Sequence, residues 1–357
     1  MSRTIALTLY KTDIDGNLLD DLSEFVTSGR IEMNTDRASG KVAASFTLSD
    51  SSRIRPYVDY LQPTLSIAFD NGDPTIVKPL GFFATRTPPA TMTIERHDAT
   101  FDVEDMTRLL AVSAYTSVDN VASSTNVGTE VGDTIAEANI SLYTIPATTA
   151  TTTKALTFPI GTTRLEKANL LLQSIGWYHL FPQADGRLTS KPYLNLEQAE
   201  PVVTITDDMV LGPVSVQTND QTLVNVVIVT RDDPAQAPLT AIARNDDPAS
   251  PSSTVSVGFE YARIERVADL QTQTEVDALA ARLLREARTY YQTATVRIWP
   301  DTNFGIHEVV DLALTGELAA LNGRWWVRRW SLGLTPSSCY YDLELNRVTD
   351  SVAGTVL

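Results

Sequence analysis

The chain has 357 residues, enough for roughly two or three domains with buried cores. Its composition, 43% hydrophobic and 20% charged, excludes an intrinsically disordered chain, and its net charge of −16 disfavours a protein that grips duplex DNA or anionic lipid. The single cysteine, Cys339, cannot form an internal disulfide or, by itself, a structural zinc site. The apolar stretch at the amino terminus is too short for the apolar region of an export signal, and no run of about 18 apolar residues predicts a membrane anchor.

The first third of the chain predicts a β-rich body. Its many threonines, with Val and Ile, favour strands over helices. Apolar and polar residues alternate over residues 4–9, which predicts a half-buried strand, and Asp15-Gly16 then predicts a turn. Further strands are expected at residues 29–33, 43–48, 64–69, 82–85, 92–95 and 99–103. This many short strands within residues 1–112 indicates a barrel or a sandwich.

Residues 113–200 predict a small α/β domain. The polar segment 113–126 and the Thr- and Ala-rich segment 147–153 read as boundary loops. Helical periodicity covers residues 131–142 and 165–175, and Thr163 and Glu166 have the spacing of a capping box for the second helix. Two strands, at 177–181 and 188–193, flank Asp185-Gly186, which is a hairpin signal.

The rest of the chain predicts a second β-rich body that is interrupted by a helix. Strands are expected at residues 201–205, 214–217 and 222–230, and the last is a nearly continuous apolar run, typical of a central strand. Residues 231–253 predict an exposed excursion, and a long helix over residues 275–292 follows a capping box of Thr272 and Glu275. Four more strands are expected at 295–299, 308–314, 324–334 and 339–347.

Candidate metal ligands lack the spacing that defines a site. His97, His179 and His307 lie far apart, and none has another His or Cys at ligand spacing. The segment Asp13-Ile-Asp-Gly-Asn17 resembles a calcium loop, but its glycine is at the fourth position instead of the sixth. A solvated turn is therefore the favoured interpretation.

No motif in the sequence identifies catalytic residues either. The sequence has no Gly-x-Ser-x-Gly elbow, phosphate loop, Gly-x-Gly-x-x-Gly or His-Glu-x-x-His motif. Adjacent carboxylates at 207–208, 232–233 and 246–247 point apart on a strand or serve solvation in a loop, so nothing selects a glycosidase pair. Cys339 alternates with apolar residues on its strand, which favours a buried thiol over a nucleophile.

Three tryptophans suggest a sugar platform as the alternative to core packing. On an alternating strand, Trp326 and Trp330 share one face and Trp325 takes the other, which favours core or subunit packing. We therefore expect no catalytic, cofactor-binding or metal-binding residue, no cofactor and no enzymatic activity.

Three stretches carry a family resemblance through their order. The first is Leu80-Gly-Phe-Phe-Ala84, followed by a strand and a short Leu-Leu helix at residues 99–110. The second is residues 165–193, with a helix, a Gly-Trp-Tyr strand, an Asp-Gly turn and a Lys-Pro-Tyr strand. The third is the helix at 275–292 with the strands at 308–312, 323–327 and 341–348. Together they resemble the hub proteins at the tail tip of long-tailed bacteriophages, the baseplate-hub or tail-associated-protein family.

This resemblance implies an α+β, mainly β fold with two β-barrel domains and two inserted small α/β domains. Residues 1–112 would form barrel one and residues 113–200 the first inserted domain. Residues 201–230 and 295–348 would form the discontinuous barrel two, residues 231–294 the second inserted domain with the long helix, and residues 349–357 a C-terminal tail.

The resemblance also implies a homotrimeric ring that closes the tail tube of the virion. Such a hub meets a distal tail or tail tube protein above and a central fibre or spike protein beneath. It forms a channel for tape-measure protein and DNA, with roles in host attachment and DNA ejection. DNA would pass without specific binding, which an acidic wall suits because it repels phosphate. The protein would have no membrane anchor and would be assembled in the host cytoplasm.

Two alternatives remain open at this point. One is a hexameric distal tail protein, although the two helix-bearing inserts argue against it. The other is a carbohydrate-binding or glycoside-hydrolysing β-protein, motivated by the tryptophan strand and the abundant carboxylates.

Overall fold

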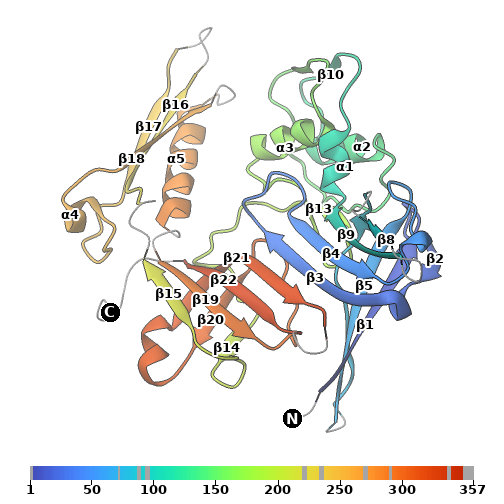
Figure 1. The fold of residues 1–357 in the computed structure, drawn as a ribbon. Coiled ribbons are helices and arrows are strands. Elements are labelled where there is room, and N and C mark those ends of the chain that lie inside the picture. The colour runs from blue at the N-terminus through green and yellow to red at the C-terminus, as the bar shows by residue number, and fades with distance from the viewer. Residues whose placement is uncertain are drawn as a thin grey trace. The chain divides into compact units, whose positions relative to one another are not determined.

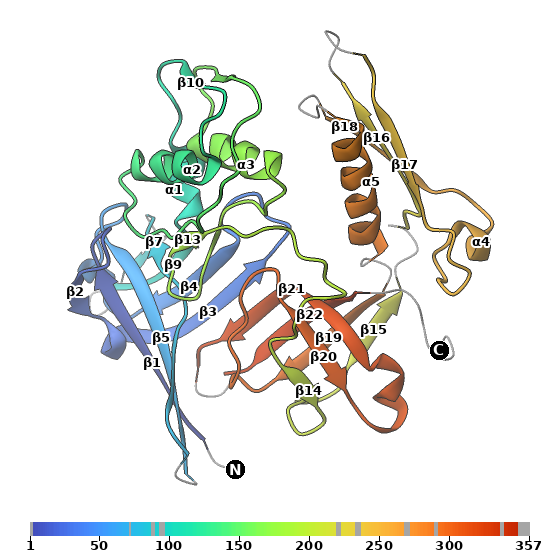
Figure 2. The same cartoon turned by 180° about the vertical axis from the view of Figure 1, so that it is seen from behind.

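The computed structural model describes residues 3–70, 73–86, 90–92, 97–218, 223–232, 237–267, 272–288, 292–335 and 339–348. The chain divides into two units. Unit 1 comprises Met1–Leu194, Trp299–Ile306 and Arg329–Asp342, and unit 2 comprises Asn195–Ile298, His307–Arg328 and Leu343–Leu357. Figures 1 and 2 label the helices and strands of each unit.

Unit 1 is built on a large antiparallel sheet. Its strands are β1 (Arg3–Thr12), β2 (Leu18–Asp21), β3 (Val26–Asn34), β4 (Val42–Leu48), β5 (Tyr60–Phe69), β6 (Ile76–Pro79), β7 (Phe83–Ala84), β8 (Ala90–Met92) and β9 (His97–Asp105). The short 3-10 helices η1 (Ser23–Phe25) and η2 (Ser51–Arg53) lie between them. The order is β21-β3-β4-β9-β7-β5-β1-β2, with β6 beside β5 and β8 beside β9, where β21 (Gly323–Gly333) contributes Arg329–Gly333. Among the strands that the structure describes, no pair closes this path into a barrel.

Most of the strands expected in the first 112 residues are confirmed. Alternating burial along β4 places Phe46 and Leu48 in the core and their neighbours toward solvent, as period-two patterning predicts. The expected strand at 82–85 shortens to β7, whose two residues bridge β5 and β9. The expected strand at 92–95 starts earlier, as β8, and residues 93–96 lie outside the described residues.

Residues 107–189 of unit 1 form three helices and two small two-stranded sheets, and the helices share a core with the large sheet (Figure 1). The elements are α1 (Thr107–Val112), which precedes the predicted first insert, and then β10 (Asp119–Val121), α2 (Val127–Ala136), β11 (Leu156–Phe158), α3 (Arg164–Ser174), β12 (Phe181–Pro182) and β13 (Leu188–Thr189). The α3 capping box is confirmed, because Thr163 N donates to Glu166 Oε2 at 2.7 Å and Glu166 N donates to Thr163 Oγ1 at 3.2 Å.

Two expectations in this insert need correction. The helix predicted over 131–142 is α2, which starts earlier, because Asn126 Oδ1 accepts a bond from Thr129 N at 3.0 Å and caps it there, and which ends earlier, at Ala136. The expected hairpin strands are only two residues long each. The turn between them holds, since Gly186 has a φ of +86° and packs so closely on Phe82 that a Cβ would overlap it.

Unit 2 contains a three-stranded sheet covered on one face by a helix (Figure 2). Its elements are β16 (Val226–Arg231), β17 (Thr240–Arg244), α4 (Thr254–Val257), β18 (Ala262–Val267) and α5 (Gln273–Arg288). The expected central strand is central, but it lies between an antiparallel β17 and a parallel β18. Residues 226–231 therefore share a sheet with the segment assigned to the second insert, and the expected excursion at 231–253 contains β17.

The remaining strands of unit 2 are β14 (Thr204–Thr206), β15 (Ser215–Thr218), β19 (Gln292–Ile298) and β20 (Val309–Ala313), with the 3-10 helix η3 (Gly316–Leu321). β15 pairs with β19, and β20 pairs with β14 and with Gly323–Trp326 of β21. The last strand, β22 (Tyr341–Arg347), has residues in both units, as β21 has. The mainly β, α+β fold class is confirmed, whereas the division into four domains stays a prediction.

Candidate functional site

The histidines do not form a metal site among the described residues. His307 is buried in unit 2 and stacks on Trp326, with ring centroids 6.4 Å apart, whereas half-buried His179 belongs to unit 1. The side chain of His97 lies outside the described residues. Within the described part of the chain, no group of three or more His, Cys, Asp or Glu side chains could hold a metal ion.

The calcium-like segment is a turn that uses its own carboxylate. Asp13 Oδ1 accepts bonds from Asp15 N at 3.0 Å and Asn17 N at 2.8 Å, and Asp13 Oδ2 accepts a bond from Asn17 Nδ2 at 2.9 Å. The Asn17 hydrogen bonds lower the pKa of Asp13 because they favour its charged form. This geometry matches the predicted solvated turn.

The adjacent carboxylates stabilise turns and loop connections. Asp207 accepts bonds from the backbone N and Oγ1 of Thr315, at 3.1 and 2.6 Å, and Asp247 accepts a bond from Ala249 N at 2.9 Å. The Thr315 hydrogen bonds lower the pKa of Asp207, so this carboxyl is ionised at neutral pH and is no proton donor.

The tryptophan strand packs into cores and does not form an exposed platform. Trp325 is fully buried and its Nε1 donates to Leu321 O at 2.9 Å, and Trp330 packs edge-on against Tyr341 at 5.3 Å. The prediction that Trp326 and Trp330 share one face is wrong, because Trp330 is buried and Trp326 is only half-buried. Trp325 and Val327 are buried in one stretch and Trp330 in the next, so the alternation shifts where β21 passes from unit 2 to unit 1.

Cys339 is buried, as predicted, and its surroundings keep the thiol protonated. The side chain is 4% exposed, and burial raises its pKa to about 11. Lys78, which is 2% exposed, donates from Nζ to Pro300 O, and burial lowers its pKa to about 8. Because the thiolate is the nucleophile, Cys339 is unsuited to nucleophilic catalysis at neutral pH.

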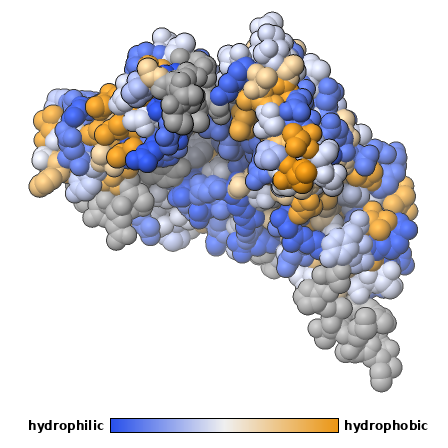
Figure 3. All heavy atoms as spheres, turned by 90° about the horizontal axis from the view of Figure 1, so that it is seen from above, coloured by the Kyte–Doolittle hydropathy of each residue, from blue (hydrophilic) through white to orange (hydrophobic). Residues whose placement is uncertain are grey.

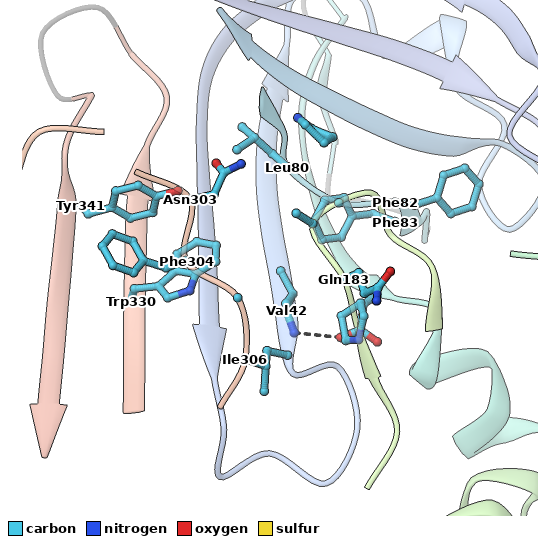
Figure 4. Close-up of a pocket in the computed structure, with 16 residues that line it drawn as sticks. Val42, Leu80, Phe82, Phe83, Gln183, Asn303, Phe304, Ile306, Trp330 and Tyr341 are labelled. Carbon is cyan, nitrogen blue, oxygen red and sulfur yellow. Dashed lines mark hydrogen bonds between the residues drawn. The ribbon is translucent and has the colours of Figure 1, made fainter. Parts of the chain in front are cut away.

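An aromatic crevice in unit 1 is too narrow for a sugar or a cofactor. Figure 4 shows Tyr341, Phe304 and Trp330 on one side and Phe82 and Phe83 on the other. The space between them is about 30 Å³, close to the volume of one water molecule and far below the roughly 300 Å³ of a small-molecule site. The crevice is a packing gap of the core.

A charged trough crosses the outer face of the unit 1 sheet. Its floor consists of small residues of β4, such as Ala43 and Ser45, and its volume is about 320 Å³. Its walls carry paired charges: Arg30 with Glu32 and Arg86 with Glu104, each at 2.9 Å. The sequence analysis missed this trough, whose signal is the Arg-x-Glu alternation on β3. A polar, charge-compensated face of this kind suits contact with a polar macromolecular surface more than an apolar ligand.

Several large apolar side chains are exposed in both units. Figure 3 shows apolar patches scattered among hydrophilic residues on one face of the molecule. Single exposed apolar residues are normal, but contiguous ones mark contact surfaces. In unit 1, Leu18 and Leu19 of the edge strand β2 are exposed, and so are Tyr57 and Val58, which are adjacent in the sequence. Among the described helices, none has the length and apolar character needed to cross a membrane.

The fold is that of phage tail proteins. No family model and no curated protein matches the sequence. Among the solved structures that match the fold over nearly the whole chain are three tail proteins. The tail protein from Neisseria meningitidis MC58 has a TM-score of 0.68 at 11% identity, covering 97% of this chain and 99% of its own. The 43 kDa tail protein of prophage MuSo2 from Shewanella oneidensis has a TM-score of 0.65 at 12% identity, with the same coverage.

A third tail protein with a similar fold comes from another bacterium. The prophage tail protein gp18 from Listeria monocytogenes EGD-e has a TM-score of 0.56 at 10% identity, covering 95% of this chain and 94% of its own. All three are tail proteins, and each is matched from end to end. The resemblance to phage tail proteins that the element order predicts is thereby confirmed for the fold of the chain.

Proposed function

We propose that the protein is the structural hub of a bacteriophage tail tip. Three copies form a ring that closes the tail tube, with two barrel-like bodies per subunit and the two inserts attached to them. A distal tail or tail tube protein binds on one side of the ring, and a central fibre or spike protein binds on the other. The observation that carries this proposal is the end-to-end fold match to tail proteins.

The ring leaves a channel through which the tape-measure protein and the DNA pass during ejection. A net charge of −16 suits a wall that must not bind the DNA, because negative side chains repel phosphate within about 8 Å at physiological salt. The protein takes part in host attachment through its fibre or spike partner, and it is assembled in the host cytoplasm as a virion component.

The hub works by binding and has no catalytic role. Three features of the described residues support this. The aromatic crevice is too small for a substrate, the Cys339 thiol is protonated at neutral pH, and the carboxylates of Asp207 and Asp247 accept hydrogen bonds that stabilise loops.

The mass of the purified complex tests the proposal. A trimer of the 39.1 kDa chain, about 117 kDa, is expected alone or after addition of the neighbouring tail proteins. A sixfold complex would favour the distal tail protein instead. A stable monomer that releases sugar from cell-wall material would contradict the hub and support the glycosidase.

A further inference from the structure

The small sheet of unit 2 is only partly covered by its helix. All seven buried residues of its core come from β16, β17 and α5, among them Val227, Ala241 and Leu283. β18 contributes none of them, and Ala262, Arg263, Ile264 and Arg266 of that strand are exposed. One strand of three therefore lacks the packing that the other two have.

A row of isoleucines crosses the face of this sheet opposite α5. Ile228 of β16 is in register with Ile242 of β17 and with Ile264 of β18. Residues Val227 and Val229 point into the helix-covered core, so the alternation of a strand places Ile228 and its two partners on the other face. Ile242 is 55% exposed and Ile264 is 60% exposed, and the row ends at the open edge of β18.

The backbone of β18 offers unused hydrogen-bonding groups along that edge. Tyr261 O accepts a bond from Val226 N at 3.2 Å, and Val267 O accepts one from Asp232 N at 3.2 Å, so the odd-numbered residues face β16. Successive residues of a strand direct their N–H and C=O groups to opposite sides, so Ala262, Ile264 and Arg266 direct theirs to the open edge. In the part of the chain that the structure describes, no strand pairs with this edge.

The other edge of the sheet is partly occupied. There, Thr240 O of β17 accepts a bond from Gln273 Nε2 of α5 at 3.0 Å. The same helix packs on β17 and β16. The edge of β18 is thus the one available for another strand.

Arg263 and Glu265 of β18 pair with each other at 2.9 Å within one strand, and the same two charges favour one antiparallel register with a second copy of that strand. When Ile264 lies opposite Ile264 of the second copy, Arg263 lies opposite Glu265 of the second copy, and the reverse pair forms by symmetry. A shift of two residues in one direction places Arg263 opposite Arg263, and a shift in the other places Glu265 opposite Glu265. Opposite charges across an antiparallel pair stabilise it and like charges destabilise it. Charged edges of this kind also discourage unspecific pairing.

We propose that two copies of this protein associate through β18, as antiparallel strands about a twofold axis at Ile264. The resulting sheet has the order β17-β16-β18-β18-β16-β17, with both α5 helices on one face and a continuous row of isoleucines on the other. This contact lies in the second insert and is independent of the threefold ring. It joins one ring to another, or joins two subunits before ring assembly.

Cysteine cross-linking tests this register directly. Residues that exchange both backbone bonds across an antiparallel pair have Cα atoms about 5.5 Å apart, which is within the range of a disulfide. The full-length Ile264→Cys variant is therefore expected to form a disulfide-linked dimer under mild oxidation, at twice 39.1 kDa on a non-reducing gel.

The matched control is Ile242→Cys, which is similarly exposed in the same row but on the opposite edge strand. The unsubstituted chain controls for Cys339. The proposal is overturned if Ile264→Cys stays monomeric or cross-links no faster than Ile242→Cys. Because the gel counts covalently linked pairs, its result does not depend on whether a trimer forms.

Variants that reverse the charges of Arg263 and Glu265 test whether these charges determine the register. Arg263→Glu and Glu265→Arg each place like charges opposite each other and should weaken dimerisation about tenfold in sedimentation experiments. The double variant Arg263→Glu/Glu265→Arg restores opposite charges and should recover the original association. A double variant no tighter than the single variants would reject this register. Unchanged association in all three variants would show that the edge serves a different occupant and would overturn the proposal.

Discussion

The two helix-bearing inserts bury their cores to different degrees. The core of the first insert belongs to one cluster of fifteen buried residues, which includes Tyr60 of β5 and Phe82, directly before β7. In the second insert, seven buried residues form a cluster that ends at β16 and leaves β18 uncovered. The first insert is thus an extension of a larger core, whereas the second depends on a small core of its own.

Both units bury charged side chains. These are Lys41, Asp59, Lys78, Asp105 and Lys167 in unit 1, and Arg231 and Arg347 in unit 2. Lys167, for example, binds Asp119 and Glu130 at 2.7 Å each, and these carboxylates raise its pKa against the effect of burial. A buried ion is stable only where fixed partners compensate its charge.

The largest expected effect is that of Leu171→Ala in α3. Leu171 is fully buried in the cluster shared with the sheet, so its truncation should lower the free energy of unfolding of unit 1 by about 3 kcal/mol. Urea denaturation should show the loss in a single transition. The control Leu170→Ala, 37% exposed on the same helix, should cost less than about 1 kcal/mol. Separate unfolding of the insert in Leu171→Ala would contradict the shared core.

Lys78 predicts a pH dependence of unit 1. Burial lowers its pKa to about 8 from 10.5, so between these values the unfolded chain holds a proton that the folded chain has lost. The free energy of unfolding should therefore rise with pH across this window, by at most about 3 kcal/mol, relative to Lys78→Met. Parallel pH profiles for the two proteins would show that Lys78 titrates normally.

Leu283→Ala in α5 probes the smaller core. The free energy of unfolding of the second insert should fall by about 2 kcal/mol. The destabilisation should stay within this insert, because its core does not extend beyond its own sheet and helix. Hydrogen exchange should accelerate in β16, β17 and α5 while the amides of β4 and β5 keep their protection. Faster hydrogen exchange throughout both units would show that the second insert does not have a separate core, and would contradict the account.

The smallest effects are those of the helix caps. Thr163→Ala and Thr272→Ala each remove one half of a capping box and should cost about 1 kcal/mol. Thr163→Ala should shift the unfolding of unit 1, whereas Thr272→Ala should change exchange only near the start of α5. Thr274→Ala, at an exposed position in the first turn of α5, serves as the control and should change little.

Local signals explain what the sequence predicts well. Both capping boxes form as expected, since the spacing of Thr163 and Glu166, and of Thr272 and Glu275, depends only on neighbouring residues. Asp-Gly turns and alternating strands are also predicted well, because their signals depend only on residues close together in the sequence. These elements also provided the order that indicated a tail protein fold, and the fold comparison confirms it.

Strand partners could not be predicted, because pairing joins residues far apart in the sequence. The apolar run of β16 identifies a central strand but not β17 and β18 as its neighbours. Burial of Lys78 depends on distant residues, so no local pattern marks it. The Arg-x-Glu alternation on β3 marks one wall of the trough, but not the residues of β4 and β9 that complete it. The shift of burial along β21 follows from one strand serving two units.

Electron cryomicroscopy of the virion tests the central claim most directly. The account predicts three copies of this chain in a ring at the tip of the tail, around a channel continuous with the tail tube. Six copies in one ring, or a position away from the tail tip, would contradict it.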